Sequence, residues 1–323
     1  TDHSNAAVTG LTNASGTEWN ADVCAIFGIS PQHLPRIVDS AGFIANAIEL
    51  AGQPPITAII GDQQASLVGQ GCISNGQAKI TFGTGGMLDV FIGDTPPTEQ
   101  TRRQHGTFPI VAFSRQGKVS YGTEAIMLSA GTNIEWLCTD MGLLSSPEQS
   151  HEVASQCDTT DGVMYVPALV GLGTPHWDYG ARGALFGITR GTNRAHIVRA
   201  VLEGVAHRGT DLVEAAEKDN SIAIAELRID GGMSRNPIFV QALANSSQRT
   251  VKVSFYTEAT TVGAGFLAGT ASGQWSHLDE AVSTLKWSNS IDPLGNSEHE
   301  RQQWEQAISR SRSWIPDLSA LDF

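Results

Sequence analysis

The sequence predicts an α/β fold organised in two domains. Two stretches have the pattern of a strand, a tight turn and a helix start: one leads to Asp62, the other to Asp230, Gly231 and Gly232. The chain has 323 residues, enough for two domains of ordinary size. Its composition, 41% hydrophobic and 16% charged with 34 glycines, is typical of globular α/β proteins. Glycines and polar residues interrupt the periodicity over residues 71–76, so we predict domains at 1–71 and 72–323.

The stretch around Asp62 organises this prediction. Branched apolar residues over 55–60 predict a buried strand, and helix formers over 63–70 predict a helix. Asp is a strong N-cap residue, so we expect a turn at Gly61 and a helix that starts at Gln63. This geometry places a carboxylate at the C-terminal end of a strand, where open α/β sheets bind ligands. The alternative is that Asp62 only caps its helix.

A glycine-rich turn follows about twenty residues later. Residues 77–82 and 87–92 predict a β-hairpin around Gly83, Thr84, Gly85 and Gly86, a turn with little side chain to keep a phosphate away. The alternative is a hairpin turn without a ligand. A carboxylate near a phosphate cradle is what phosphoryl transfer to an alcohol needs, because one group takes the hydroxyl proton while the other holds the donor.

The remaining elements follow in order. Thr132 and Glu135 match a capping box, which is one explanation for Glu135. The glycines at 231 and 232 allow close approach of a ligand to a helix N-terminus, or form a plain connecting turn. We expect Trp304 and Trp314 to pack the last helix against the domain. The other predicted elements are a short helix over 22–28, a hairpin over 109–121 with its tip at 116–117, helices over 124–130, 196–205, 260–271, 276–290 and 298–314, and strands over 163–169, 226–230 and 251–255.

Charge and cysteine content exclude several classes of protein. A net charge of −13 argues against nucleic acid as a partner. The four cysteines have no metal or redox spacing, which favours thiols in a reducing compartment. His176 and Asp178 are too few for a metal site. No apolar run reaches the length of a membrane span, so we predict a cytoplasmic protein with no membrane partner. The oligomeric state, including a homo-oligomer, is left open.

Four separated motifs give the chain a family resemblance. They are Gly61-Asp62-Gln63-Gln64-Ala65, Gly83-Thr84-Gly85, the loop from Gly171 to Asp178 with the signature that continues from Gly183 to Glu203, and Gly231-Gly232 with Asn236. In this order, the motifs resemble the FGGY carbohydrate kinases, most closely the glycerol kinase branch. The resemblance covers nearly all of residues 1–290.

The resemblance implies a ribonuclease-H-like, actin-like ATPase fold. It also implies that residues 1–71 are the second part of the N-terminal domain and that residues 72–323 are a complete C-terminal, nucleotide-binding domain. On this basis we expect an upstream part to be absent from the sequence, and we expect the chain alone to be inactive.

The resemblance further implies an ATP-dependent kinase that phosphorylates a primary hydroxyl of glycerol or a similar polyol or sugar. Asp62 would be the general base and would help to hold Mg²⁺, and Gln63 would lie near the acceptor. Met87 would also face the acceptor, at a place where glycerol kinases usually have an aromatic residue. The residues that would contact ATP are Gly83, Thr84, Gly85, Gly131, Glu135, Gly231, Gly232 and Asn236. Glycerol kinases often have Gln in place of Glu135.

Two alternatives remain. One is another FGGY substrate such as xylulose, ribulose or gluconate, which the departure at Met87 favours. The other is a non-catalytic nucleotide-binding or regulatory module built on the same fold.

Overall fold

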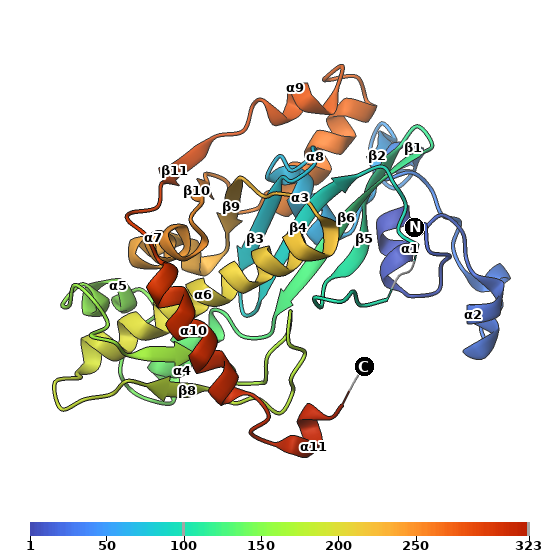
Figure 1. Cartoon of the computed structure of the whole chain (residues 1–323). Helices are drawn as coiled ribbons and strands as arrows, with labels where there is room; N and C mark the ends of the chain where they lie inside the picture. The colour runs from blue at the N-terminus through green and yellow to red at the C-terminus, as the bar shows by residue number, and fades with distance from the viewer. Residues whose placement is uncertain (99–100, 322–323) are drawn as a thin grey trace.

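The computed structural model describes residues 1–98 and 101–321. In this part of the chain, one mixed sheet of nine strands has the order β11-β10-β9-β3-β4-β6-β5-β1-β2 (Figure 1). Its strands are β1 (Ala41–Asn46), β2 (Pro55–Ala58), β3 (Ala78–Phe82), β4 (Gly86–Gly93), β5 (Phe108–Arg115), β6 (Lys118–Met127), β9 (Glu226–Asp230), β10 (Thr250–Ser254) and β11 (Trp287–Ile291). A separate ribbon pairs β7 (Met164–Val166) with β8 (Ala184–Phe186). The large sheet joins strands from both predicted domains, so the division at residue 71 stays a prediction.

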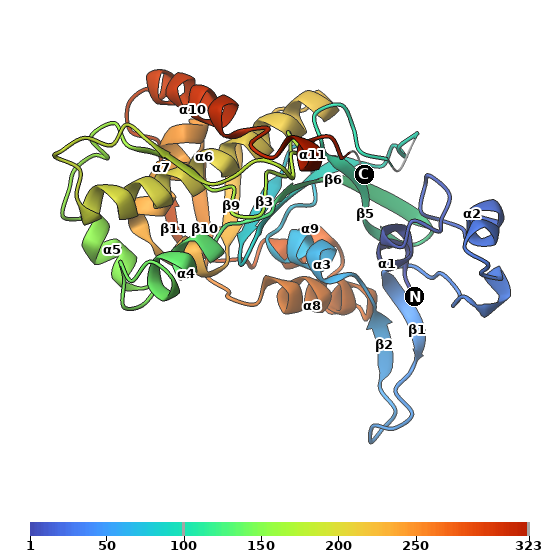
Figure 2. The same ribbon diagram turned by 90° about the horizontal axis from the view of Figure 1, so that it is seen from below.

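Helices cover both faces of the sheet, with α6 on one face and α3 and α8 on the other (Figure 2). None of the described helices is long and apolar enough to cross a membrane. The helices are α1 (His3–Val8), α2 (Ala21–Ile26), α3 (Asp62–Gly69), α4 (Thr132–Thr139), α5 (Gln149–Ala154), α6 (Arg194–Asn220), α7 (Pro237–Ser247), α8 (Ala259–Ala271), α9 (Leu278–Val282), α10 (Glu298–Ser311) and α11 (Pro316–Ser319), with 3₁₀ turns η1 (Pro31–His33) and η2 (Gly232–Arg235).

The main hydrophobic core lies between the sheet and α6 and α7. Ile80 and Phe82 of β3 point into it together with Leu88 of β4, and the ring of Phe82 meets that of Phe239 edge-on at 4.7 Å. Because side chains alternate along a strand, the residues between these core positions face the opposite side, toward α3. This alternation decides which side chains can reach a ligand.

The helices on the opposite face pack unusually closely. A Cβ atom added to Gly69 of α3 would lie 1.9 Å from the carbonyl oxygen of Ala259, and one added to Gly263 of α8 would lie 1.8 Å from that of Ala65. Only glycine permits this backbone contact. The predicted close packing of the helix over 260–271 is therefore confirmed, and it fixes the position of α3.

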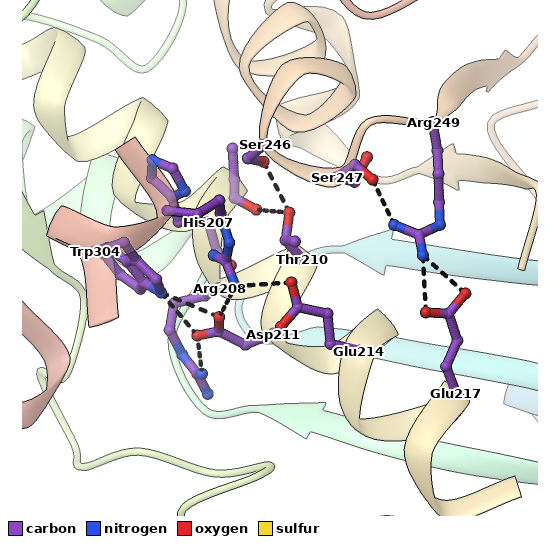
Figure 3. Close-up of polar contacts among 12 residues, drawn as sticks. His207, Arg208, Thr210, Asp211, Glu214, Glu217, Ser246, Ser247, Arg249 and Trp304 are labelled. Atoms are coloured by element: carbon purple, nitrogen blue, oxygen red, sulfur yellow. Dashed lines mark hydrogen bonds and ion pairs between the residues drawn. The ribbon is translucent and has the colours of Figure 1, made fainter. Parts of the chain in front are cut away.

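A buried polar network attaches α10 to α6 (Figure 3). The carboxylate of Asp211 accepts hydrogen bonds from Arg208 at 2.7 Å, from Arg301 at 2.8 Å and from the indole of Trp304 at 3.1 Å. Burial opposes its charge, but Arg208 and Arg301 outweigh burial and lower the pKa of Asp211. The prediction that Trp304 packs is confirmed. The prediction for Trp314 is wrong: its side chain is 71% exposed because the chain turns at Ser313, where φ is +53°.

Several predicted elements differ from the structure. The helix over 124–130 is wrong, because residues 118–127 form β6 and pair with both β4 and β5. The helix over 276–290 is limited to α9, because residues 287–291 pair with β10 as β11. The strand before Asp62 exists as β2, but it lies at the sheet edge and Ile56 is 41% exposed, so its predicted burial is wrong. The hairpins over 77–92 and 109–121 are confirmed.

Candidate active site

Asp62 is the first residue of α3, and its exposed side chain faces a cavity. Gly61 takes the N-cap position in an extended conformation, so the prediction that Asp62 caps a helix beginning at Gln63 is wrong. A Cβ atom at Gly61 would meet the side chain of Gln64 at 2.3 Å, and the Gly61 N–H donates to Ser4 Oγ at 2.9 Å. One carboxylate oxygen of Asp62 accepts from the N–H of Gln63 at 2.8 Å. The rest of the carboxylate is available to a ligand.

The cavity beside Asp62 has a volume of about 270 Å³. Asp62, Gln63 and Ser66 of α3 line one wall. The opposite wall is formed by strand residues of the sheet and by the start of α8: Lys79, Thr81, Met87, Asp230, Gly231, Thr257, Glu258, Ala259 and Thr260. The structure therefore brings the three predicted acceptor-side residues, Asp62, Gln63 and Met87, into one site.

The predicted phosphate turn is tied to a second predicted glycine. The carbonyl oxygen of Gly83 accepts from the N–H of Gly131, and that of Thr84 accepts from the N–H of Ala130, both at 2.8 Å. A Cβ atom at Gly131 would lie 2.6 Å from the Gly83 oxygen, so glycine is required there. Gly83 and Thr84 are exposed. The turn after β3 and the start of α4 thus form one backbone surface with little side chain.

The third glycine turn joins this surface from β9. Gly231 has φ +88°, and a Cβ atom there would lie 2.3 Å from the carbonyl oxygen of Phe82. Gly231 therefore lies directly against the residue that precedes Gly83. A Cβ atom at Gly232 would meet nothing within 4 Å, so this backbone is open. Exposed backbone N–H groups close to a helix start are suited to bind an anion.

Of the predicted nucleotide residues outside the glycine turns, Asn236 has structural partners. The side-chain oxygen of Asn236 caps α7, and its amide nitrogen donates to Ser150 Oγ at 3.0 Å. Glu135 is exposed on α4. The predicted capping box with Thr132 is wrong: the N-cap of α4 is Gly131, and the Thr132 hydroxyl donates to the carbonyl oxygen of Thr84 instead. Glu135 follows Gly131 by four residues and Asn236 follows Gly232 by four, and the contact of Glu135 and Asn236 with a nucleotide stays a prediction.

Sequence analysis did not identify a buried charged pair at the cavity, of which Lys79 lines the cavity itself. The ammonium of Lys79 lies 2.7 Å from Asp89, and both side chains are almost completely buried. Asp89 is the Cα partner of Lys79 on one side and of Glu124 on the other. A charged residue inside an apolar strand, as in Ala78-Lys79-Ile80, was the signal that could have identified them.

A second acidic group faces the same cavity. Asp230 ends β9, and within the described residues its Oδ1 atom is buried without a hydrogen-bond partner. Burial raises the pKa of this carboxyl above its ordinary value. A buried and unsatisfied oxygen beside a cavity favours a ligand that supplies a positive charge or a donor. No group of three metal-ligating side chains occurs among the described residues.

Comparison with known proteins gives a consistent result. Residues 78–272 match the FGGY family of carbohydrate kinases, C-terminal domain, and residues 1–69 match the N-terminal domain of the same family. The chain is 37% identical to a glycerol kinase of Oceanobacillus iheyensis and 40% identical to one of Dechloromonas aromatica. Each alignment covers 97% of this chain but 63% of the relative, so the chain spans less than two thirds of the length of these proteins.

Solved structures show the same fold. The Plasmodium falciparum glycerol kinase with ADP superimposes with a TM-score of 0.88 at 31% identity, over 96% of this chain and 63% of that one. A ligand-bound xylulose kinase from Lactobacillus acidophilus superimposes with a TM-score of 0.85 over 99% of this chain and 65% of that one, at 22% identity. The predicted actin-like ATPase fold is therefore confirmed.

Proposed function

The chain belongs to the FGGY family of carbohydrate kinases, and we propose that its protein transfers the γ-phosphoryl group of ATP to a primary hydroxyl of glycerol or a similar polyol. One observation carries this proposal. The accessible carboxylate of Asp62 and the side chain of Met87 line one cavity, and β3, which forms its floor, leads directly into the glycine surface around Gly83. This arrangement supports a base and an anion-binding surface on either side of the proposed acceptor position.

In the proposed reaction, Asp62 accepts the proton of the attacking hydroxyl. Its free oxygen faces the cavity, and a positioned base of this kind typically contributes about 10²–10⁴-fold to the rate. Gln63, the next residue of α3, presents an amide that can donate to or accept from another hydroxyl of the acceptor. Met87 supplies the apolar surface against which the carbon chain of the polyol lies.

The donor binds on the glycine surface. We assign its phosphates to the backbone N–H groups of Gly83, Thr84 and Gly85, and its nucleoside to Gly131, Glu135, Gly231, Gly232 and Asn236. Backbone N–H groups close to a helix start can hold phosphates without a cluster of lysines, which suits a chain with a net charge of −13. Catalysis then consists mostly of positioning and of stabilising the charge of the transferred group.

The residues present also fit Mg²⁺. Mg²⁺ takes oxygen ligands, keeps several waters, and usually needs only one or two carboxylates besides the phosphates. Asp62 and the unsatisfied oxygen of Asp230 supply two such carboxylates in the same cavity. We propose that they hold Mg²⁺, which when bound neutralises charge on the phosphates. The proposal needs no closed cage of protein ligands.

The test replaces Asp62 with Asn in the whole protein. It measures ATP-dependent phosphorylation of glycerol, of larger polyols and of sugars. We expect kcat to fall by about 10²–10⁴-fold, while ADP affinity measured without Mg²⁺ and the melting temperature stay close to wild type. Asp22→Asn is the matched control, because Asp22 is also an exposed aspartate in a first helical turn. Retained turnover in Asp62→Asn would remove Asp62 as the base.

The same panel decides between the alternatives. If the wild-type protein phosphorylates a ketose or a sugar acid but no simple polyol, the proposed polyol acceptor is wrong, and the proposed phosphoryl transfer from ATP to a hydroxyl stands. If the protein binds ATP and phosphorylates no acceptor, it is a nucleotide-binding module, and the proposed activity is refuted.

A further inference from the structure

A row of side chains crosses the sheet face that carries the cavity. In the register of β3, β4 and β6, Thr81 is opposite Met87 and Met87 is opposite Ile126. Directly opposite residues in antiparallel strands share a face, so these side chains stand next to one another. Thr81 and Met87 line the cavity beside Asp62, and Ile126 does not.

Ile126 instead lines a second cavity of about 490 Å³. The walls of this cavity include Val8 of α1, Phe108 and Ile110 of β5, and Glu124 of β6. Since Met87 and Ile126 are Cα partners, the two cavities are neighbours on one face of the sheet. The second cavity is lined mostly by apolar residues, and among the described residues that line it Glu124 carries a carboxyl group.

Glu124 has no structural role that the contacts explain. Among the residues described, its carboxyl makes no hydrogen bond or ion pair, although the side chain is only partly accessible. The charged groups that face it are Asp89 of β4, Lys79 of β3 and Asp62 of α3. Burial first, and then the carboxylate of Asp89, raise the pKa of Glu124 to about 8. This raised pKa favours the protonated carboxyl, which can both donate and accept a hydrogen bond.

We propose that the acceptor site extends from Asp62 past Met87 into the second cavity, where Glu124 binds a distal hydroxyl of the acceptor. From β3 to β6 the distance is two strand spacings, about 10 Å. A three-carbon polyol is shorter than this span, and a linear polyol or open-chain sugar of five or six carbons matches it. The inference rests on the proposed function and narrows its substrate class to include these longer acceptors.

The test compares glycerol with a linear pentitol as acceptor for Glu124→Leu in the whole protein. We expect the ratio of kcat/KM for the pentitol to that for glycerol to fall at least about tenfold, through a higher KM for the pentitol. Glu124→Gln, whose amide also donates and accepts, should keep the ratio within about threefold. Glu152→Leu, a change at an exposed residue of α5, should leave the ratio unchanged.

A second variant tests the path between the cavities. Ile126→Phe should raise the KM for the pentitol more than the KM for glycerol, because a larger side chain narrows the junction beside Met87.

The outcomes separate this inference from the proposed function. If the wild-type protein phosphorylates glycerol but not the pentitol, or if Glu124→Leu keeps the wild-type ratio while it melts normally, the extended site is refuted and the kinase stands. If no polyol of either length is phosphorylated, both fail.

Discussion

Replacing Lys79 with Met tests whether the ion pair beneath the cavity holds the sheet together. Lys79 is 1% exposed, its ammonium lies 2.7 Å from Asp89, and it also donates to the Thr81 hydroxyl at 3.3 Å. Burial disfavours the charged ammonium, but the Asp89 carboxylate outweighs this penalty and raises the pKa of Lys79. Methionine has a similar shape and no charge, so the substitution leaves Asp89, which is 0% exposed, without a counter-charge.

The size of the effect follows from that geometry. Removing one partner of a buried pair typically costs about 3–5 kcal/mol, because the remaining charge is uncompensated. With a urea dependence of roughly 3 kcal/mol per molar, the unfolding midpoint at pH 8 should fall by about 1 M or more. Replacing both residues, as Lys79→Met with Asp89→Leu, removes the stranded charge. The double variant should return to within about 1 kcal/mol of wild type.

The pH dependence gives a second, independent readout. In Lys79→Met, the pKa of the unpaired Asp89 in the folded state should lie above its unfolded value of about 3.9, so the folded state binds more protons. The stability of this variant is then greatest below that pH and falls as pH rises, by up to about 1.4 kcal/mol per unit. Urea unfolding followed by tryptophan fluorescence at pH 5 and pH 8 measures it. A loss below about 1 kcal/mol at pH 8, with no difference between the two pH values, would refute the reasoning.

Three further predictions concern the glycine surface and two histidines. Gly231→Ala should destabilise the fold by more than about 1 kcal/mol, because its Cβ atom would meet the Phe82 carbonyl oxygen and φ is +88°. Gly232→Ala should keep its melting temperature but lose ADP affinity in calorimetry, since the free space at its Cβ is where we place the nucleotide. Burial lowers the pKa of both His207 and His176 from 6.5 to about 4, so the unfolded state binds more protons below pH 6.5. Each histidine should therefore lower the free energy of unfolding by about 3 kcal/mol as pH falls from 6.5 to 4. In urea titrations, His207→Gln should remove about half of this combined loss of stability.

Local sequence signals predicted the elements that depend on local geometry. The turn at Gln116 and Gly117 has positive φ at both residues, which is the backbone that their sequence favours. The strand, turn and helix around Asp62 were also predicted, although the strand lies at the sheet edge and is not buried as expected. The cap position was misplaced by one residue, because Gly61 fits against Gln64 where a residue with a side chain would not.

The errors occur where tertiary pairing overrides local preference. Residues 124–127 contain good helix formers, yet they form the middle of β6 because β4 and β5 pair with both of its edges. Residues 287–291 join the sheet only because β10 offers an open edge. A single sequence does not show which strand has an edge open for pairing, so these two strands could not be predicted from it.

The site was predictable only in part for the same reason. The motifs around Asp62 and the glycine turns are contiguous in sequence, so a pattern can identify them. Lys79, Asp89 and Glu124 come from three strands and become neighbours only through the register of the sheet. Each one alone is a charged residue in a strand, and its partner cannot be read from the sequence.

Lys79, Asp89 and Glu124 form a row of charged residues across the sheet face that carries the cavity. This row indicates why that face differs from the one that packs on α6. Ile80, Leu88 and Ala125 must face the core against α6, so the residues beside them in the strands necessarily face α3. Apolar residues there would satisfy packing at no cost, since a buried ion pair is often no better for stability than an apolar pair. The pair of Lys79 and Asp89 is therefore poorly explained as a stabilising device. Its position is more informative: Lys79 lines the cavity of Asp62, and Asp89 lies between Lys79 and Glu124 in the register of the sheet.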